Sequence, residues 1–511
     1  MKRNILDYFV RTVESYKNKV ALVHRDKKLT FSELNNMSLQ LSDYLIEILG
    51  SVTNKPICIF LPKGFELIIS DIAAIYSCNL FNNLDVKTPS SRIKNIIDVL
   101  HPSIIITNTK YKNILENIDN ITYPIINLDE DNWEAGYGHI EEIHRRLNKQ
   151  IDTDPLCIIN TSGSTGTPKG VLLTHRGFLD YLNWATITFK FNGSEILGVM
   201  SAVVFDHFAY EICLMMTKGS TLVLLDQELA AFPAKLMMEV QNKNVNYIFW
   251  VPTVMVNIAN MGLLDKIKLT ELKIVWFAGE VFPTRQFNMW RKAYPNVTFV
   301  NLYGPCEISV DCTYYIVKKD FQDNEPLPIG IPCCNSDVFL LNDDDKKCAV
   351  GEIGEICVRG SSLAMGYYNN PEKTQSVFVQ NPLNSQYPEI VYRTGDLAYW
   401  NEEGVLMFKG RKDTLIKHMG NRVELGEIEH IAVNTLKLIP NCCVLYNFSK
   451  KNIVMLYESD ADISVPELRK ALGSQMPKYM VPSEYIKLEQ MPRNTNGKID
   501  RLALNKLVNK E

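Results

Sequence analysis

The chain has 511 residues, of which 46% are apolar and 22% charged, and its formal net charge is -4. This composition excludes fibrous and disordered classes and fits about three domain-sized units, or one large domain and a small one. The charge balance offers no basic surplus for nucleic acid or for an anionic membrane.

The sequence near the N-terminus reaches Asp7 before any apolar run of signal-peptide length. No stretch approaches the roughly 18 uncharged apolar residues of a membrane span. We therefore expect a cytoplasmic protein with no membrane insertion and no nucleic-acid partner.

The 12 cysteines are scattered without CxxC spacing, and the 8 histidines show no HExxH pattern. Cysteines distributed in this way are typical of reduced thiols that pack as small apolar residues. We expect no structural zinc site.

The first part of the chain, to about residue 410, alternates short apolar runs with amphipathic stretches. This alternation predicts parallel sheets covered by helices. The clearest helical candidates are residues 65–78 and 232–244. The predicted strands are residues 56–60, 103–107, 156–160, 171–175, 221–225, 247–251, 273–277 and 297–301.

After GEIGEICVRG (351–360) the pattern changes to hairpins, in which VYRTGDLAYW and VLMFKGR flank the turn NEEG. A smaller unit follows residue 413, with a helix over 424–436 and strands near CCVLY and IVMLY. Ser464, with Glu467 three residues later, predicts the start of another helix. The sequence thus predicts two very unequal domains.

The loop TSGSTGTPKG (161–170), between two predicted strands, is rich in Gly, Ser and Thr. Glycines permit positive φ, so that backbone N–H groups converge, and the short hydroxyls add donors. Such a loop suits a polyphosphate, although a flexible surface loop is the alternative reading. It is not a Walker A loop, because Lys169 lies between Pro168 and Gly170.

Further islands follow this loop in a fixed order: FDHF (205–208), NLYGPCE (301–307), GEIGEICVRG (351–360), YRTGD (392–396), GRKDTLIKHMGNRVELGEIE (410–429) and NGKID (496–500). Taken singly, each is more often a solvated loop or a hairpin turn. In this order they resemble the core motifs of the adenylate-forming superfamily, which includes acyl- and aryl-CoA synthetases, luciferase and peptide-synthetase adenylation domains. The resemblance is closest to stand-alone amino-acid adenylation enzymes such as D-alanine–carrier protein ligases.

The resemblance implies an α/β fold. It comprises a large N-terminal adenylation domain (1–411) of parallel-rich sheets with helices plus a small β-barrel-like part, a hinge (412–414), and a small mobile α+β C-terminal domain (415–511). It also implies a ligase that uses ATP and Mg²⁺ to convert an amino acid into aminoacyl-AMP, releasing pyrophosphate. The acyl group then passes to the phosphopantetheine thiol of a carrier protein.

The family's nucleotide-binding residues carry over by motif. Phosphate binding would fall to Thr161, Ser162, Gly163, Ser164, Thr165, Gly166 and Lys169. Tyr303 and Gly304 would lie along adenine, Asp396 would accept from the ribose hydroxyls, and Arg411 would make a second ribose or phosphate contact. Glu307 would face Mg²⁺, because a hard cation prefers carboxylate oxygen.

Asp206, which follows Phe205, would pair with the α-ammonium of an amino acid, since an unpaired buried charge is expensive. The alternative is an exposed aspartate at a strand end.

The family's side-chain pocket maps by motif offset to His207, Tyr210, Phe249, Trp276, Ala278, Leu302, Val310 and Asp311. The bulky Phe249 and Trp276 favour a small side chain, serine or alanine before larger ones, and Asp311 could bond a hydroxyl or an amine. Simple core packing of these aromatics is the alternative.

Cys306 departs from the family, which usually has a threonine there that bonds the α-phosphate. The resemblance makes Lys498, with Cys306 and Glu307, part of the catalytic set, and it makes Asp413 the pivot of the small domain.

No carrier-domain segment appears in the chain, so we expect a carrier protein in trans. The alternatives are an acyl- or aryl-CoA synthetase and a non-catalytic descendant that binds nucleotide.

Overall fold

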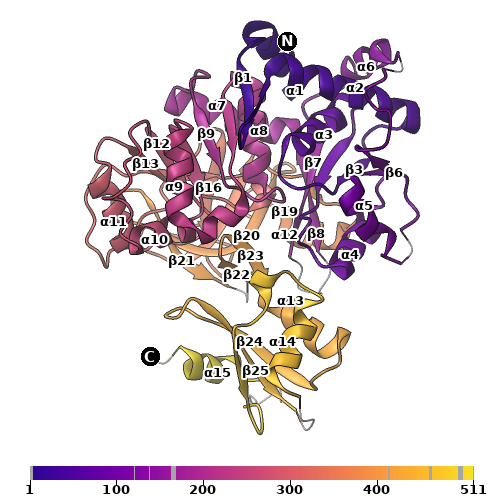
Figure 1. Cartoon of the computed structure of the whole chain (residues 1–511). Coiled ribbons are helices and arrows are strands. Elements are labelled where there is room, and N and C mark those ends of the chain that lie inside the picture. The colour runs from indigo at the N-terminus through magenta and orange to yellow at the C-terminus, as the bar shows by residue number, and fades with distance from the viewer. Residues whose placement is uncertain are drawn as a thin grey trace.

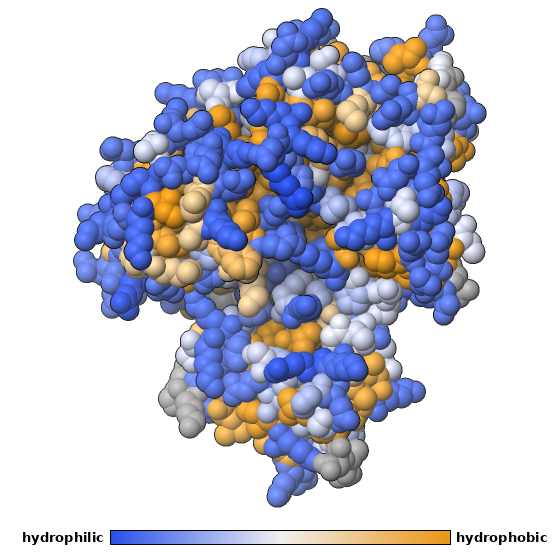
Figure 2. Space-filling model, in the orientation of Figure 1, coloured by the Kyte–Doolittle hydropathy of each residue, from blue (hydrophilic) through white to orange (hydrophobic). Residues whose placement is uncertain are grey.

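The computed structural model describes residues 4–119, 121–136, 138–162, 168–412, 415–459, 463–492 and 499–509. Within them the chain forms a large upper body and a smaller lower lobe (Figure 1). The space-filling view shows the body narrowing where the lobe joins it (Figure 2). Within the described ranges, no helix has both the length and the apolar character needed to cross a membrane.

Two predominantly parallel sheets form the frame of the body. Across the described residues, one has nine strands in the order β15 (Ile331–Pro332), β14 (Thr313–Ile316), β13 (Thr298–Tyr303), β12 (Ile274–Phe277), β11 (Tyr247–Trp250), β9 (Ile196–Val199), β10 (Thr221–Leu224), β1 (Val20–His24) and β2 (Lys27–Thr30). The other has seven, in the order β18 (Gly366–Tyr367), β8 (Lys169–Thr174), β7 (Pro155–Thr161), β4 (Leu80–Asn83), β3 (Pro56–Ile59), β5 (Ile104–Thr107) and β6 (Ile125–Asn127). The predicted strands are confirmed to within a residue or two.

The helices of the body are α1 (Ile5–Tyr16), α2 (Phe31–Leu49), α3 (Phe65–Tyr76), α4 (Ser90–Leu100), α5 (Thr109–Glu116), α6 (Ile140–Leu147), α7 (His175–Phe189), α8 (Asp206–Lys218), α9 (Pro233–Asn242), α10 (Pro252–Asn260), α11 (Thr284–Ala293) and α12 (Pro371–Val377). The helices predicted over 65–78 and 232–244 are α3 and α9.

The segments in which the sequence predicted hairpins and a small β-barrel-like part form an antiparallel sheet. Over the part of the chain described, its five strands are β16 (Ser336–Leu341), β17 (Gly354–Gly360), β19 (Phe378–Gln380), β20 (Ile390–Trp400) and β21 (Leu406–Arg411). The strands β20 and β21 flank the predicted turn, and their pairing sets Asp396 opposite Arg411.

The small lobe is α+β, as predicted. It contains the hairpin β22 (Leu415–His418) and β23 (Asn421–Glu424), the strands β24 (Asn441–Asn447), β25 (Asn452–Glu458) and β26 (Glu484–Lys487), and the helices α13 (Leu425–His430), α14 (Val465–Gly473) and α15 (Arg501–Val508). A capping box between Ser464 and Glu467 opens α14. The hairpin lies at the junction with the body (Figure 1).

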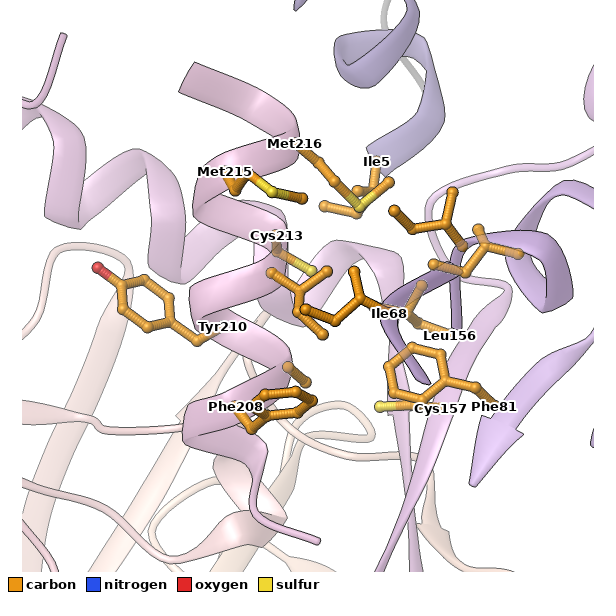
Figure 3. Packing of buried hydrophobic residues seen from close by; sticks show 14 of the residues in the cluster. Ile5, Ile68, Phe81, Leu156, Cys157, Phe208, Tyr210, Cys213, Met215 and Met216 are labelled. Carbon is orange, nitrogen blue, oxygen red and sulfur yellow. The ribbon is translucent and has the colours of Figure 1, made fainter. Parts of the chain in front are cut away.

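The central helices α3 and α8 are buried on nearly every side. A helix that is apolar all round belongs inside a core rather than on its surface. Figure 3 shows Cys213 of α8 facing Ile68 of α3, with Met216 of α8 beside Ile5 of α1. This core fixes the N-terminus of α8, where Asp206 lies, relative to both sheets.

Ile68 tests this packing, because its side chain is fully buried between the helices. We expect Ile68→Ala to lower the free energy of unfolding by about 2–5 kcal/mol, through lost burial and the cavity left behind. Urea unfolding measures this, with Ile187→Ala as the control because Ile187 is 71% exposed. Equal losses in the two variants would contradict the packing described.

Candidate functional site

Several of the described residues singled out from the sequence, among them Lys169, Glu307 and Arg411, meet at the junction between the body and the hairpin. The strands β7 and β13 end there, β8 begins there, and β20, β21 and the N-terminus of α8 border the same region. A cavity of about 360 Å³ opens at this junction, lined by residues that include Lys169, Tyr367, Arg411, Arg422 and Glu424.

The ends of the predicted phosphate loop are held by the β7–β8 pairing, in which Thr161 lies opposite Lys169. Ser162 donates a hydrogen bond of 2.9 Å to the carbonyl oxygen of Arg422. Lys169 Nζ lies 2.9 Å from a carboxylate oxygen of Glu424, and burial lowers the pKa of this lysine. The predicted residues Gly163, Ser164, Thr165 and Gly166 lie outside the described residues.

Glu307 is fully buried. Its two oxygens lie 2.9 and 2.8 Å from Arg422 Nη1, and Tyr367 donates to Oε1 at 2.7 Å. Burial alone would raise the pKa of Glu307, but Arg422, the Tyr367 hydroxyl and Lys169 together lower it to about 2. The carboxylate is therefore ionised at neutral pH.

A tight turn carries Glu307 toward the junction. A Cβ added at Gly304 would come within 2.4 Å of Asp311 Cα and of Val310 O, so the backbone approach there requires glycine. Val310 has a φ of 79°, which is costly for a β-branched residue. The Val310 N–H donates to Asp206 Oδ2 at 3.1 Å, which helps to hold this strained backbone in place.

Tyr303, Asp396 and Arg411 form a connected group on the other side of this turn. The Tyr303 hydroxyl donates to Asp396 Oδ2 at 2.5 Å, and Arg411 Nη1 lies 2.6 Å from Asp396 Oδ1. Lys417 of the hairpin lies over the Tyr303 ring, with Nζ 5.3 Å from its centroid. The sequence predicted the first three residues as one site but assigned no role to Lys417.

Asp206 is the first residue of α8 and is 8% exposed. Besides the Val310 N–H, its carboxylate accepts from the His207 N–H at 3.0 Å. Burial raises the pKa of Asp206, and the nearby His207 ring and the two backbone bonds oppose that shift. Phe205 occupies the N-cap position of the same helix without a side-chain capping bond, and Cys306 is half-buried in the turn beside Glu307.

The residues predicted to line a side-chain pocket pack against one another. The Trp276 ring is fully buried, with the rings of Tyr210 and Phe249 centred 5.9 and 5.5 Å away. His207 lies 4.4 Å from Phe249, centroid to centroid. The remaining members are also buried: Ala278, Leu302 and Val310.

Tyr181 of α7 was missed by the sequence analysis. Its hydroxyl donates to Asp311 Oδ2 at 3.0 Å, while no described group bonds Asp311 Oδ1. Burial and the nearby Asp206 carboxylate raise the pKa of Asp311 to about 8, against the opposing effects of Tyr181 and Lys417. No local pattern marks Tyr181, because it lies 130 residues from its partner.

Arg422 and Glu424 lie within a motif that the sequence analysis quoted, but they were given no role. Asp413 and Lys498 lie outside the described residues. Among the residues that are described, no group of three or more His, Cys, Asp or Glu side chains is arranged to hold a metal.

A family model described as "AMP-binding enzyme" matches residues 9–368. The chain belongs to the AMP-binding enzyme family. This finding confirms the resemblance to the adenylate-forming superfamily.

Several curated relatives of this AMP-binding enzyme are named as synthases. It is 28% identical to tyrocidine synthase 1 of Brevibacillus parabrevis over 98% of this chain and 45% of that protein. It is 29% identical to zwittermicin A synthase ZmaJ of Bacillus cereus over 99% of this chain and 95% of that protein. The chain spans less than half the length of the first of these relatives.

The solved structures that it resembles show a shared fold. An adenylation domain of Vibrio cholerae, AlmE, bound to glycyl-adenosine-5'-phosphate, aligns with a TM-score of 0.83 and 20% identity over 99% of this chain and 98% of that one. The o-succinylbenzoate CoA synthetase of Bacillus subtilis aligns with a TM-score of 0.82 and 18% identity, over 99% of this chain and 98% of that chain.

The raised pKa of Asp311 makes a pH-dependent prediction for this AMP-binding enzyme. Between the unfolded pKa near 4 and the folded value of about 8, the folded chain binds more protons at this position than the unfolded chain does. The stabilisation that Asp311 contributes is thus complete below about pH 4 and is lost as pH rises toward 8. Over this range the free energy of unfolding falls by at most about 1.4 kcal/mol per pH unit.

Urea unfolding from pH 5 to 8 measures the effect against Asp311→Asn, which cannot ionise. The stability of the wild type should fall relative to the variant as pH rises. A difference that stays constant over this range would contradict the assignment.

Proposed function

We propose that this enzyme activates an amino acid with ATP as aminoacyl-AMP and passes the acyl group to the phosphopantetheine thiol of a carrier protein. The observation that carries the proposal is Asp206, a buried carboxylate whose described hydrogen bonds come from two backbone N–H groups. An α-ammonium taken into this region would supply the positive charge that such a carboxylate lacks.

Two steps make up the proposed reaction. A substrate carboxylate oxygen attacks the α-phosphorus of ATP, and the bond to the departing pyrophosphate breaks. The carrier thiol then attacks the acyl carbon, loses its proton, and releases AMP. Lys498 would stabilise the charge of the first step, and Asp413 would be the hinge, at 412–414, between the domains 1–411 and 415–511.

The donor set fits magnesium. Mg²⁺ is usually held by one or two carboxylates together with substrate phosphates rather than by an all-protein cage. Glu307 is such a carboxylate, fully buried and ionised. When bound, Mg²⁺ would neutralise phosphate oxygens, while Lys169 and the loop from Thr161 hold them. Asp396 and Arg411 would bind the ribose beside Tyr303 and Gly304.

The aromatic packing favours a small side chain. Trp276, Tyr210 and Phe249 fill the space beyond Asp206, and Asp311 offers one carboxyl oxygen. The Asp311 oxygen that no described group bonds could bond a side-chain hydroxyl. Serine is therefore the preferred candidate, with alanine next.

A CoA synthetase acting on a fatty or aryl acid is the second candidate, favoured by the structural likeness to o-succinylbenzoate CoA synthetase. Carrier transfer is supported by a likeness to NpsA-ThdA, an artificially fused adenylation-PCP di-domain protein from Klebsiella oxytoca, with a TM-score of 0.80 and 20% identity over 94% of this chain and 93% of that chain. ATP–pyrophosphate exchange across the amino acids tests the proposal. Exchange with fatty or aryl acids and with no amino acid would favour the second candidate.

Asp206→Ala should remove the partner of the ammonium, at a cost of about 3–5 kcal/mol. The amino-acid KM in the exchange assay should rise by about two orders of magnitude or more, with ATP binding preserved. Asp337→Ala is the control, because Asp337 is an exposed residue of β16 in the antiparallel sheet. A KM within a few-fold of wild type would show that Asp206 is not the ammonium partner.

Lys498→Ala should reduce amino-acid-dependent pyrophosphate exchange by about 10²–10³-fold, the usual value of an electrostatic stabiliser in the transition state. It should still transfer acyl from a supplied aminoacyl-adenylate to a carrier thiol at near the normal rate. Wild-type exchange, or equal loss of both half-reactions in a folded variant, would contradict this role.

A further inference from the structure

A tyrosine of α7 holds one oxygen of a buried carboxyl group. The Tyr181 hydroxyl donates to Asp311 Oδ2 at 3.0 Å, and the two residues are 2% and 1% exposed. Asp311 Oδ1 is also removed from solvent, yet no described residue donates a hydrogen bond to it. The carboxyl group therefore has one occupied acceptor and one open acceptor.

The ring of this tyrosine has little freedom to move. It packs against the rings of Trp184 and Tyr210, whose centroids lie 5.1 Å away in each case. The terminal torsion of an aspartate side chain, by contrast, is broad, so its own rotamer does not fix the carboxyl plane. Because the ring is held in place, the bond from Tyr181 sets which oxygen of Asp311 is left open.

Asp311 lies near Asp206, the proposed partner of the α-ammonium. It follows Val310, whose N–H donates to Asp206 Oδ2 at 3.1 Å, and burial and the nearby Asp206 carboxylate raise the pKa of Asp311. Tyr210, which contacts the Tyr181 ring, lies one turn after Asp206 on α8. A buried acceptor without a partner is rare and destabilising, so a donor on a bound substrate would relieve it.

We propose that Tyr181 is a positioning residue for substrate selection, which reserves Asp311 Oδ1 for the side-chain hydroxyl of a β-hydroxy amino acid. The inference rests on the proposed function, in which Asp206 holds the ammonium of the same substrate. A hydroxyl fits a single open acceptor because it has one O–H to donate. A side-chain ammonium has three N–H donors, and the neighbouring rings of Trp276 and Phe249 offer them no oxygen.

The selection is measured as the ratio of kcat/KM for serine to kcat/KM for alanine in ATP–pyrophosphate exchange, with both enantiomers of each. Wild type should favour serine by about 100-fold or more, since a site that bonds a substrate hydroxyl rejects the analogue that lacks it. Tyr181→Phe removes one oxygen and keeps the ring in its packing. It should lower the ratio by about tenfold through its effect on serine, and change kcat/KM for alanine by less than about threefold.

A second substitution tests whether Tyr181 acts through Asp311. In the Asp311→Ala chain, adding Tyr181→Phe should leave the serine-to-alanine ratio unchanged, because the tyrosine has lost the group that it orients. Tyr294→Phe is the matched control, and it should keep the wild-type ratio. Tyr294 is 7% exposed at the end of α11, and its hydroxyl donates to the Ile267 carbonyl oxygen at 3.1 Å.

Binding of the unreactive acyl-sulfamoyl adenosines of serine and alanine measures the same preference without turnover. Isothermal titration calorimetry should give the wild type a lower Kd for the seryl compound than for the alanyl compound. Tyr181→Phe should reduce this preference by a factor similar to that seen in exchange. Tyr294→Phe should leave it as in the wild type.

The outcomes separate the inference from the function on which it rests. Wild type that exchanges with no amino acid and binds neither compound would overturn both. Wild type that prefers alanine, diaminopropionate or any other amino acid without a side-chain hydroxyl would overturn the inference and leave amino-acid activation intact.

The variants decide the role of Tyr181 by itself. A serine preference that Tyr181→Phe leaves unchanged would overturn that role, as would an equal loss with serine and alanine, which indicates packing alone. A fall in the ratio that Tyr181→Phe also produces in the Asp311→Ala chain would show that the tyrosine does not act through Asp311.

Discussion

The buried negative charge of Glu307 is the constraint on which the junction depends. An isolated ionised carboxylate inside a protein costs several kcal/mol, so its partners must be held in place. They come from separate parts of the chain: Tyr367 from β18, Lys169 from β8 and Arg422 from the small lobe. This one charge therefore ties both domains to the turn after β13.

The same turn links the two halves of the proposed site. Gly304 allows the backbone to double back on Asp311, and the strained Val310 then donates to Asp206. Glu307, on the proposed metal side, and Asp206, on the proposed ammonium side, are thus positioned by a single segment of backbone. Strain of this kind persists only where the surroundings hold it, and here the core around α8 does so.

The sequence predicted the elements better than their contacts. The apolar runs of β11, β12 and β13 and the capping box of α14 follow from local patterns, as do the conformations of β20 and β21. The ordered motifs also named most of the groups that meet at the junction. Their roles as ligand-binding residues stay predictions.

The sequence could not predict which residues form pairs when they lie far apart along the chain. Arg422 and Glu307 are 115 residues apart, and Tyr181 and Asp311 are 130 apart, with no periodicity that joins them. The partners are set by how the small lobe docks and by how α7 packs, and both are decided by tertiary burial rather than by local propensity. Tyr181 had no signal at all, whereas Arg422 lay inside a motif in which Arg411 and Asp413 had assigned roles.

Carboxylate-oxygen transfer tests the central claim, formation of an aminoacyl-adenylate, most directly. The enzyme would be supplied with MgATP, hydroxylamine and serine labelled with ¹⁸O in its carboxylate. Attack of the carboxylate on the α-phosphorus, followed by cleavage of the acyl C–O bond, should leave one ¹⁸O in the phosphate of AMP. Unlabelled AMP, or ADP with labelled inorganic phosphate, would contradict the account.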